Sequence, residues 1–429
     1  MCGPGMGSLG MQRMNKEIVV IGGGAAGMMA AIAAAERGAA VRLLEPNERL
    51  GKKLNITGKG RCNVTNNCPV EELMANIPRN GKFLYSALTR FTSADAMAFF
   101  EGIGVPLKTE RGNRVFPVSD CSFDVSGALK RRMEKLGVRW EHDRAVSLLT
   151  EEGAVCAVQG EKKEYPAAAV ILATGGVSYP GTGSTGDGYR MAARLGHTIV
   201  EPHGSLVPLV SDDPCCGQMQ GLALKNVQLS ARNEKGKIVF SEFGEMLFTH
   251  FGVSGPLVLS ASAHLRDWGK HSYRLSIDLK PALSEEKLEE RLLRELREQS
   301  NRNMENVLSS LLPHSMVPVM CRRLGLSPEL KANSLKKEQR RALLQELKHF
   351  GLSVTGPRPV AEAIVTSGGV KVGEVNPNSM ESKKARGLFF AGEILDVDAY
   401  TGGFNLQIAW ATGRAAGIAA AETEGERKL

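Results

Sequence analysis

The glycine spacing Gly22-x-Gly24-x-x-Gly27 is the feature of this chain that most directly indicates chemistry. An apolar run, 17–21, precedes it, and an alanine-rich run, 25–37, follows it. A strand, a glycine turn and a helix in this order bring unpaired backbone amides and a positive dipole end to a pyrophosphate. Gly22 would make the tight turn, Gly24 would admit the phosphate, and Gly27 would let the helix pack on the strand. The pattern predicts a dinucleotide-binding domain.

Two features after the fingerprint extend this prediction. Glu45 ends a second apolar run, 40–44, where a carboxylate can accept hydrogen bonds from a ribose diol and would repel the 2′-phosphate of NADP. The following loop, 46–63, combines glycines with an excess of basic over acidic side chains. That charge suits a long phosphate-bearing cofactor, although a solvated basic loop has the same composition. The basic residues of the loop are Arg49, Lys52, Lys53, Lys59 and Arg61.

Two segments carry a resemblance to a known family. GGGAAG (22–27) and GKKLNITGKGRCNVTN (51–66) resemble the signature of a bacterial flavoprotein family, the YhiN-type and BaiN-type proteins with the aminoacetone oxidases. The similarity extends from Glu17 to near Gly417. It implies FAD as the cofactor and an α/β fold, a glutathione-reductase-like two-dinucleotide-fold FAD domain with a Rossmann-type parallel sheet and a β-meander. The glycine spacing alone predicts only a dinucleotide.

The fingerprint and the resemblance together predict the residues that contact FAD. By resemblance, the backbone near Val146 would meet the adenine, and Glu393 would contact the ribityl chain. The helix that opens at Leu406 would point its N-terminus at the flavin pyrimidine and stabilise negative charge there. The expected contacts are Gly22, Gly24, Ala25, Ala26, Gly27, Glu45, Lys52, Lys53, Gly58, Lys59, Gly60, Arg61, Cys62, Asn63, Val146, Thr174, Gly175, Gly176, Gly392, Glu393, Asn405, Leu406 and Gln407.

The FAD-binding domain is expected to be discontinuous, over residues 15–204 and 351–429, with an inserted region over 205–350. The insertion begins with strand-like runs and continues over 284–348 as a charged helical region with leucines at helical spacing. We expect it to be a β and helical domain that binds substrate or forms a lid. Met1–Gln12 is expected to be a loose leader. Further expected elements are helices within 70–102 and over 126–136, a meander (145–149 and 154–159), strands at 170–172, 222–231, 237–240, 273–279 and 387–393, and a final helix at 406–422.

Composition excludes several classes of protein. A charged fraction of 23% with a net charge of +8 over 429 residues is ordinary for a folded chain and argues against disorder. Eight cysteines are too few for a disulfide scaffold, and their spacing lacks both a C-x-x-C redox pair and paired metal ligands, so no metal is expected. The uncharged stretch 18–35 contains three consecutive glycines, so a strand and a helix fit it better than a membrane span. A cytoplasmic protein without a membrane partner is expected.

Other residues offer weaker candidates. Gly181-x-Gly183-x-x-Gly186 could be a second, nicotinamide fingerprint, but residues 178–180 separate it from the preceding strand, and it is more similar to a flavin-lining loop. Tyr179, His250 and Tyr400 are candidate proton donors. The loop of His250 also has a structural interpretation. In that interpretation Ser254 caps a helix and Pro256 occupies its first turn.

We therefore expect a flavoprotein oxidoreductase that takes hydride from NADH or NADPH. Among the resembling proteins, the BaiN-type activity is reduction of the conjugated C=C bond of 3-oxo-4-ene and 4,6-diene bile acids, which implies a hydrophobic enone substrate and a role in steroid and lipid metabolism. The alternatives are an FAD-dependent amine or aminoacetone oxidase that uses oxygen, and an RNA-binding flavoprotein. Nucleic acid is not expected as a partner, because aromatic residues are only 5% and no basic stripe with interleaved aromatics occurs. The oligomeric state stays open.

Overall fold

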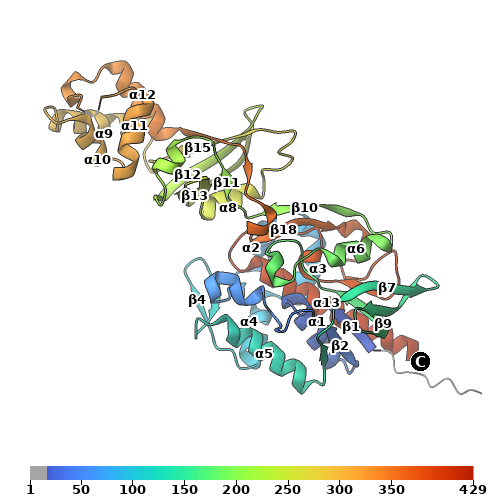
Figure 1. Ribbon diagram of the computed structural model, residues 1–429. Helices are drawn as coiled ribbons and strands as arrows, with labels where there is room; N and C mark the ends of the chain where they lie inside the picture. The colour runs from blue at the N-terminus through green and yellow to red at the C-terminus, as the bar shows by residue number, and fades with distance from the viewer. Residues whose placement is uncertain (1–16, 328, 429) are drawn as a thin grey trace, which may run out of the picture.

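The computed structural model describes residues 17–327 and 329–428, without the side chains of 424–428. The chain forms a larger α/β lobe and a smaller lobe in which a β-sheet leads to a group of helices at the far end (Figure 1). The expected leader, Met1–Gln12, lies outside the described residues.

A parallel sheet forms the centre of the larger lobe. β1 is buried along its whole length, as expected for an apolar strand covered on both faces. The carboxyl ends of these parallel strands meet at one edge, and the glycine turns follow there. The strands run in the order β6 (Arg139–Glu141), β2 (Val41–Leu44), β1 (Glu17–Ile21), β9 (Glu164–Leu172) and β19 (Leu388–Phe390).

A β-meander continues the sheet on one side. β7 (Ala145–Glu151) pairs antiparallel with β8 (Ala154–Gly160), which pairs with the start of β9. β9 therefore has two roles, because its first residues complete the meander and its remainder joins the parallel sheet beside β1. The strand predicted at 170–172 is the end of this longer strand.

Helices and small sheets cover the larger lobe. The helices predicted within 70–102 are present, and the predicted helices over 126–136 and 406–422 are each longer than expected. A three-stranded sheet, in the order β3-β5-β4, borders a cavity at the carboxyl ends of the parallel strands. The elements are α1 (Ala25–Glu36), η1 (Leu54–Gly60), β3 (Thr65–Asn66), α2 (Val70–Ala75), α3 (Gly81–Arg90), α4 (Ser93–Gly102), β4 (Leu107–Glu110), β5 (Arg114–Pro117), α5 (Ser122–Lys135), η2 (Pro180–Thr182), α6 (Asp187–Arg194) and α13 (Phe404–Lys428).

The smaller lobe has its own sheet and its own hydrophobic core, which runs from Leu209 to Val354. The paired strands β10 (Ile199–Ser205) and β18 (Val365–Val370) lie at the junction of the two lobes (Figure 1). The division at 204/205 and 350/351 stays a prediction. The sheet order is β16 (Phe350–Val354), β15 (Tyr273–Asp278), β12 (Ala223–Asn233), β13 (Ile238–Thr249), β14 (Gly252–Ser254), β11 (Leu209–Val210) and β17 (Gly356–Pro357). The helices are α7 (Cys215–Gln218), α8 (Pro256–Ser262), α9 (Glu285–Glu298), α10 (Met304–Ser309), α11 (Val317–Arg323) and α12 (Lys337–Lys348).

The predicted fold class is confirmed: a Rossmann-type parallel sheet with a β-meander and an inserted β and helical region. One local prediction is wrong. The residue that caps α8 is Gly255, at φ 90°, and not Ser254. A Cβ at Gly255 would lie 2.9 Å from the backbone of Met246, so the close strand at this point requires glycine. In the part of the chain described, no helix has the length and hydropathy needed to cross a bilayer.

α1 and α13 pack so closely that backbone touches backbone. A Cβ added at Gly413 would lie 2.4 Å from the carbonyl oxygen of Ala26, and one added at Gly417 would lie 2.3 Å from that of Ala30. Both distances are shorter than a carbon and an oxygen tolerate. Glycine at these two positions therefore fixes the separation of the two helices.

This packing predicts unequal effects for two Gly→Ala substitutions. Gly417→Ala inserts a methyl group against α1 and should lower the free energy of unfolding by about 1–3 kcal/mol. Gly102→Ala adds the same group where nothing lies within 4 Å. It should leave the free energy unchanged or raise it by at most about 1 kcal/mol. Urea denaturation of the two variants measures the difference, and equal stabilities would contradict the close packing.

Candidate cofactor-binding site

A cavity of about 1020 Å³ opens at the carboxyl ends of the parallel strands. Loops after β1, β2, β9 and β19 line one part of it, and the junction with the smaller lobe contributes Leu206, Pro256 and Ile364. Ligand pockets usually measure about 300–1,000 Å³, so this cavity has the volume for a long ligand. It lies at the strand ends, where open α/β sheets bind their ligands.

The glycine fingerprint shows three different environments. A Cβ at Gly27 would lie 1.8 Å from the carbonyl oxygen of Gly22, and Gly22 itself has φ 106° with Ala173 against it, so packing fixes both. A Cβ at Gly24 would meet nothing within 4 Å. Gly24 is the N-cap of α1, and no side chain caps this helix. The first-turn amides of α1 thus lie at the cavity without a side-chain partner.

Glu45 is buried at the cavity edge and is held in a fixed orientation. Its Oε2 accepts a hydrogen bond from the Gly23 amide at 2.7 Å. Its Oε1 accepts from the Asn47 amide at 2.8 Å and from Asn47 Nδ2 at 2.7 Å. A carboxylate offers about four acceptor positions, so at least one remains for a diol.

Acidic side chains from elsewhere in the chain neutralise part of the positive charge of the basic loop, 46–63. Arg61 pairs with Glu110 and Asp120, each at 2.5 Å, and its guanidinium lies 4.1 Å from the centre of the Phe116 ring. Lys53 pairs with Glu393 at 2.7 Å. Within the described residues, the cations of the loop that line the cavity without an ion pair are Lys52 and Lys59. The expected charge on the cofactor side is therefore smaller than the loop composition implies.

Glu393 is the centre of a partly buried hydrogen-bond network. Its carboxylate accepts hydrogen bonds from Lys53 Nζ, from the Thr366 amide at 2.8 Å and from Ser178 Oγ at 2.9 Å. Burial alone would raise the pKa of Glu393, but the charge and hydrogen bond of Lys53, with those of Thr366 and Ser178, lower it below its usual value. The carboxylate is therefore ionised and fixed in the cavity wall at neutral pH.

Most of the predicted cofactor contacts come together around this cavity. The residues that line it are Gly22, Gly24, Ala25, Ala26, Glu45, Lys52, Lys53, Gly58, Lys59, Arg61, Asn63, Thr174, Gly175, Gly392, Glu393, Asn405 and Leu406. Those that the structure places outside the lining are Gly27, Gly60, Cys62, Val146, Gly176 and Gln407.

The residues outside the lining have structural surroundings of their own. Gln407 is buried and bonds to Thr65 Oγ1 and to the carbonyl oxygen of Phe91. A Cβ at Gly176 would lie 2.2 Å from Thr366 Oγ1. Val146 is 47% exposed on β7. Their roles toward a cofactor stay predictions.

The cysteine thiols of this region are unreactive. Burial raises the pKa of Cys62 to about 12, and burial with the nearby Glu72 raises that of Cys68 to about 11. Both thiols stay protonated at neutral pH and are poor nucleophiles. Cys215 and Cys216 in α7 are buried and unbridged.

Of the three candidate proton donors, Tyr179 and Tyr400 line the cavity. His250 is exposed in the smaller lobe, in the turn between β13 and β14, and does not line it. Asn66, Arg114 and the junction residues also line the cavity and were not predicted from the sequence. Asn66 ends the signature segment 51–66. For Arg114 and the junction residues no local pattern indicates a site, because the tertiary fold alone brings them there.

The second glycine series does not follow a strand. β9 ends at Leu172, and the turn η2 comes before Gly183. Thr182, Gly183 and Ser184 line the same cavity as the first series. The series therefore belongs to this site, and the structure gives no support to a separate nicotinamide fingerprint there.

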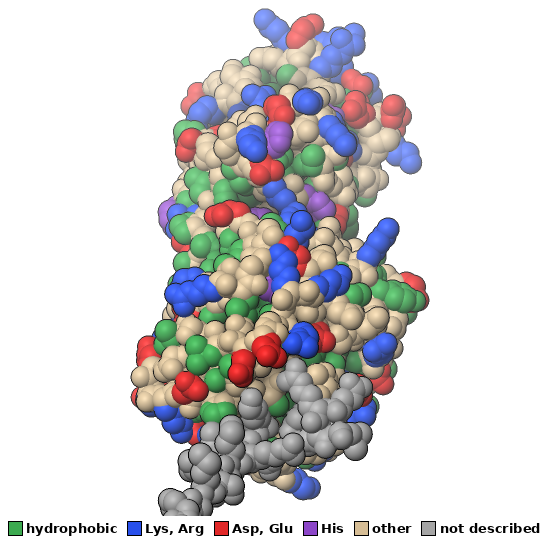
Figure 2. All heavy atoms as spheres, turned by 90° about the vertical axis from the view of Figure 1, so that its right-hand side faces the viewer, with side chains coloured by type: hydrophobic (Ala, Val, Ile, Leu, Met, Phe, Trp, Pro, Cys, Tyr) green, Lys and Arg blue, Asp and Glu red, His purple; other side chains and the backbone are tan. Residues whose placement is uncertain are grey.

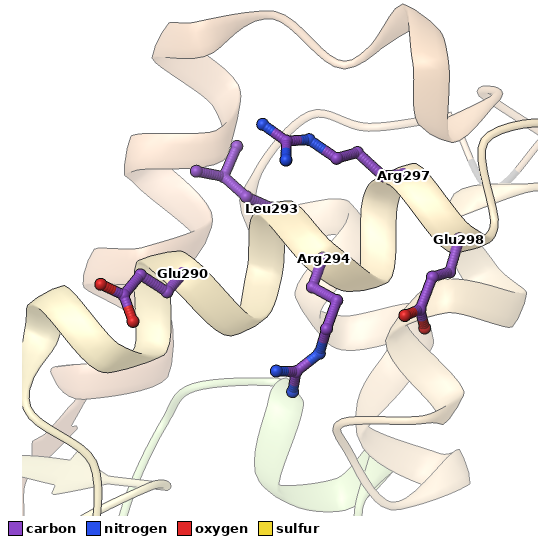
Figure 3. A pocket seen from close by; sticks show the side chains of 5 residues that line it. All are labelled: Glu290, Leu293, Arg294, Arg297 and Glu298. Atoms are coloured by element: carbon purple, nitrogen blue, oxygen red, sulfur yellow. The ribbon is translucent and has the colours of Figure 1, made fainter.

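A shallow hollow of about 320 Å³ lies on α9, within the helical part of the smaller lobe. Its lining comes from one helix, and Figure 3 shows Arg294 and Arg297 on different sides of that helix. Charged side chains that diverge from one surface do not form a binding site, so we assign no ligand to it.

The residues of the large cavity fit FAD. An uncapped α1 with an open Gly24 suits a pyrophosphate, and Glu45 suits a ribose. α13 begins at the same cavity without an acidic residue in its first turn. Asn63 Oδ1, Asn66 Oδ1 and Thr174 Oγ1 are buried beside it with no hydrogen-bond partner in the described protein.

A family profile decides the relationship. The HI0933-like protein Rossmann domain matches residues 16–419. The chain belongs to the HI0933-like family. The resemblance to YhiN-type and BaiN-type flavoproteins is therefore confirmed, and this member of the family is an FAD-dependent oxidoreductase.

Curated relatives of this HI0933-like chain match over nearly their whole length. It is 31% identical over 417 residues to a 3-dehydro-bile acid Δ(4,6)-reductase of Clostridium scindens, covering 95% of this chain and 100% of the relative. It is 30% identical to a ribosomal RNA dihydrouridine synthase of Escherichia coli, covering 92% of this chain and 96% of the relative. A protein of the same name from Haemophilus influenzae is 29% identical, covering 94% and 98%.

Solved structures show the same fold at low identity. A 3-ketosteroid Δ4-(5α)-dehydrogenase of Rhodococcus jostii matches with a TM-score of 0.52 at 18% identity, covering 96% of this chain and 99% of that one. A 3-ketosteroid Δ1-dehydrogenase of Sterolibacterium denitrificans matches with a TM-score of 0.50 at 14% identity, covering 95% and 99%.

The environment of Gly24 predicts a variant that folds but binds the cofactor poorly. In Gly24→Val the new side chain enters open cavity space where the pyrophosphate would lie. We expect FAD affinity to fall at least about tenfold, which corresponds to about 1.4 kcal/mol. Titration of the apoprotein with FAD by flavin fluorescence measures this.

Gly102→Val, on the surface of α4, is the matched control and should bind FAD like the wild type. The melting temperature of the Gly24→Val apoprotein should stay within a few degrees of the wild type. Wild-type FAD affinity in Gly24→Val would rule out the phosphate-binding role of this turn.

Proposed function

We propose that this HI0933-like protein is an FAD-dependent reductase of carbon–carbon double bonds conjugated to a carbonyl group. One observation carries the proposal. The residues expected to bind FAD, the phenol of Tyr400 and the apolar junction residues all line the same cavity. The names of two relatives point to the same chemistry. A Δ(4,6)-reductase saturates bonds conjugated to a 3-oxo group, and dihydrouridine is uridine with its conjugated ring double bond saturated.

A steroid-like enone is our first candidate substrate. The 3-dehydro-bile acid Δ(4,6)-reductase of Clostridium scindens aligns with this chain over its full length. The junction side of the cavity presents Leu206, Pro256, Ile364 and Val365, which suit a flat apolar ring system. The substrate would lie between this side and the flavin side.

The chain's own residues have separate tasks in this reaction. When bound, FAD supplies hydride transfer, with NADH or NADPH as the proposed source of electrons. The α1 N-terminus at Gly24 binds the phosphates, and Glu45 holds a ribose. The α13 N-terminus stabilises negative charge at the cavity. The Tyr400 hydroxyl donates a hydrogen bond or a proton to the substrate as its carbonyl oxygen gains charge.

Uridine in ribosomal RNA is the second candidate substrate. Two relatives of that name match over nearly the whole chain, and the net charge of +8 is compatible with a polyanion. Acidic and basic side chains are interspersed on the face shown in Figure 2, so that face offers no continuous basic surface. The apolar junction side of the cavity is why we place the small enone first.

A two-step reduction experiment tests the proposal. The holoenzyme is reduced anaerobically with NADH or NADPH and then mixed with a 3-oxo-4-ene steroid, with a 3-oxo-4,6-diene steroid or with a ribosomal RNA fragment. Rapid flavin reoxidation by one of these acceptors, with a product that has gained two hydrogens by mass spectrometry, is the expected result. Gly24→Val serves as the cofactor-deficient control.

The outcomes separate the candidates. Reoxidation by steroid alone favours the enone substrate, and reoxidation by RNA alone, with binding that weakens as salt rises, transfers the assignment to uridine. Fast reoxidation by air without a response to any of the three acceptors would instead indicate an oxidase and overturn the proposal.

A further inference from the structure

A hydrogen bond between Tyr400 and His264 connects the two lobes at the cavity. Tyr400 lies just before α13 and lines the cavity. His264 lies just after α8 in the smaller lobe. His264 Nε2 is 2.5 Å from the Tyr400 hydroxyl oxygen, and the two ring centres are 5.9 Å apart.

Both partners are held in place by their own lobes. The amide of Tyr400 donates to the carbonyl oxygen of Asn76, and its carbonyl oxygen accepts from Asn405 Nδ2. The His264 amide donates to the carbonyl oxygen of Ala261, and its ring lies 5.6 Å from that of Phe240 on β13. The contact is therefore a fixed part of the fold on both sides.

The surroundings set the protonation of this pair. Burial, with Glu242 on β13 and Asp398 before α13, raises the pKa of Tyr400 to about 12. Burial and the nearby Arg266 lower the pKa of His264 below its usual value, against the opposing effect of Asp398. At neutral pH the phenol keeps its proton and the imidazole is uncharged. With its proton on Nε2, the imidazole donates to the phenol oxygen, which leaves the Tyr400 O–H free to donate to a ligand.

We propose that Tyr400 and His264 form a proton relay, in which Tyr400 protonates the substrate and His264 restores the proton of Tyr400. The inference rests on the proposed function. Hydride addition to the β-carbon of the enone moves the π-electron pair to the carbonyl oxygen. The Tyr400 O–H then transfers its proton to the α-carbon of the enolate, which restores the carbonyl group. As solvent delivers a proton to Nδ1 of the partly exposed imidazole, His264 Nε2–H passes to the phenolate oxygen, so that the ring stays neutral. Tyr400 is the catalytic residue, and His264 is a positioning and relay residue.

The relay gives the smaller lobe a chemical task. Tyr400 belongs to the lobe that carries the fingerprint, whereas its proton source belongs to the lobe expected to cover the substrate. The proton donor is therefore complete only where the two lobes meet.

Stopped-flow kinetics of the two half-reactions test the relay. Flavin reduction by NADH or NADPH should proceed at the wild-type rate in Tyr400→Phe and His264→Ala. Reoxidation by the enone should slow about 100-fold in Tyr400→Phe, the lower end of a typical general-acid contribution. It should slow about tenfold in His264→Ala. The double variant should be no slower than Tyr400→Phe, because residues that act as a unit are not additive.

Matched controls are Tyr85→Phe and His271→Asn. Tyr85 is exposed on α3, and His271 is exposed in the smaller lobe, where it pairs with Glu234. Both variants should keep the wild-type reoxidation rate.

Two readouts separate a relay from a merely structural contact. Added imidazole should restore much of the reoxidation rate of His264→Ala and none of that of Tyr400→Phe. The wild-type reoxidation rate should stay level from neutral pH into the alkaline range. A phenol with a raised pKa stays protonated there, and the rate falls only as the pH approaches about 12.

A third readout needs no turnover. NMR of the histidine ring protons should show the His264 resonance titrating below the usual histidine pKa, and this resonance should move in Tyr400→Phe but not in Tyr85→Phe.

If the wild type reduces the enone and His264→Ala does so equally fast, the relay is wrong and the proposed function stands. Failure of imidazole to rescue a slow His264→Ala would also overturn the relay. If the wild type reduces no conjugated acceptor, the proposed function fails and the relay fails with it.

Discussion

The position of α1 is the constraint on which the rest of the site depends. Gly27 brings the helix against the turn at Gly22, and Gly413 and Gly417 bring α13 against its other side. Between these contacts the helix cannot shift, so its uncapped N-terminus stays aimed at the cavity. A helix dipole acts only over its first turn, and a small displacement would remove its effect on a phosphate. Close packing thus holds the α1 N-terminus where its positive dipole end can stabilise a phosphate.

The same packing places the second half of the cofactor site. α13 lies on α1, and Asn405 in its first turn bonds to the backbone of Ala399 and Tyr400 in the preceding loop. Glu393, just after β19, lies against the basic loop and forms an ion pair with Lys53 at 2.7 Å. Ends of the chain that are far apart in sequence therefore form one cavity wall through a few fixed contacts.

Local order along the chain is what the sequence predicted well. A strand, a glycine turn, a helix and an acid occur within 30 residues in this chain, so spacing alone locates them. Ion pairs between residues far apart in the sequence could not be predicted from spacing. The charge of Arg61 is taken by Glu110 and Asp120, and that of Lys53 by Glu393, 340 residues away. From composition alone, both cations were expected to be available to bind phosphate. Only the tertiary fold shows that acidic side chains pair with them. His264 was missed for the same reason, because a single histidine after a short helix has no pattern.

The proposed division of the cavity into a cofactor side and a substrate side would account for relatives named for a steroid and for an RNA. Fingerprint residues, which serve the cofactor, lie on strands and helices fixed by backbone packing. The residues that face the substrate side, such as Leu206, Pro256 and Ile364, lie at the junction with the smaller lobe. Changes at that junction alter shape and polarity without moving α1. Reduction of a conjugated double bond needs the same parts in either case: a hydride source, a proton donor and stabilisation of one negative charge. In the proposed function, the lobe junction therefore determines substrate choice and completes the proton donor, while the packed core positions the cofactor.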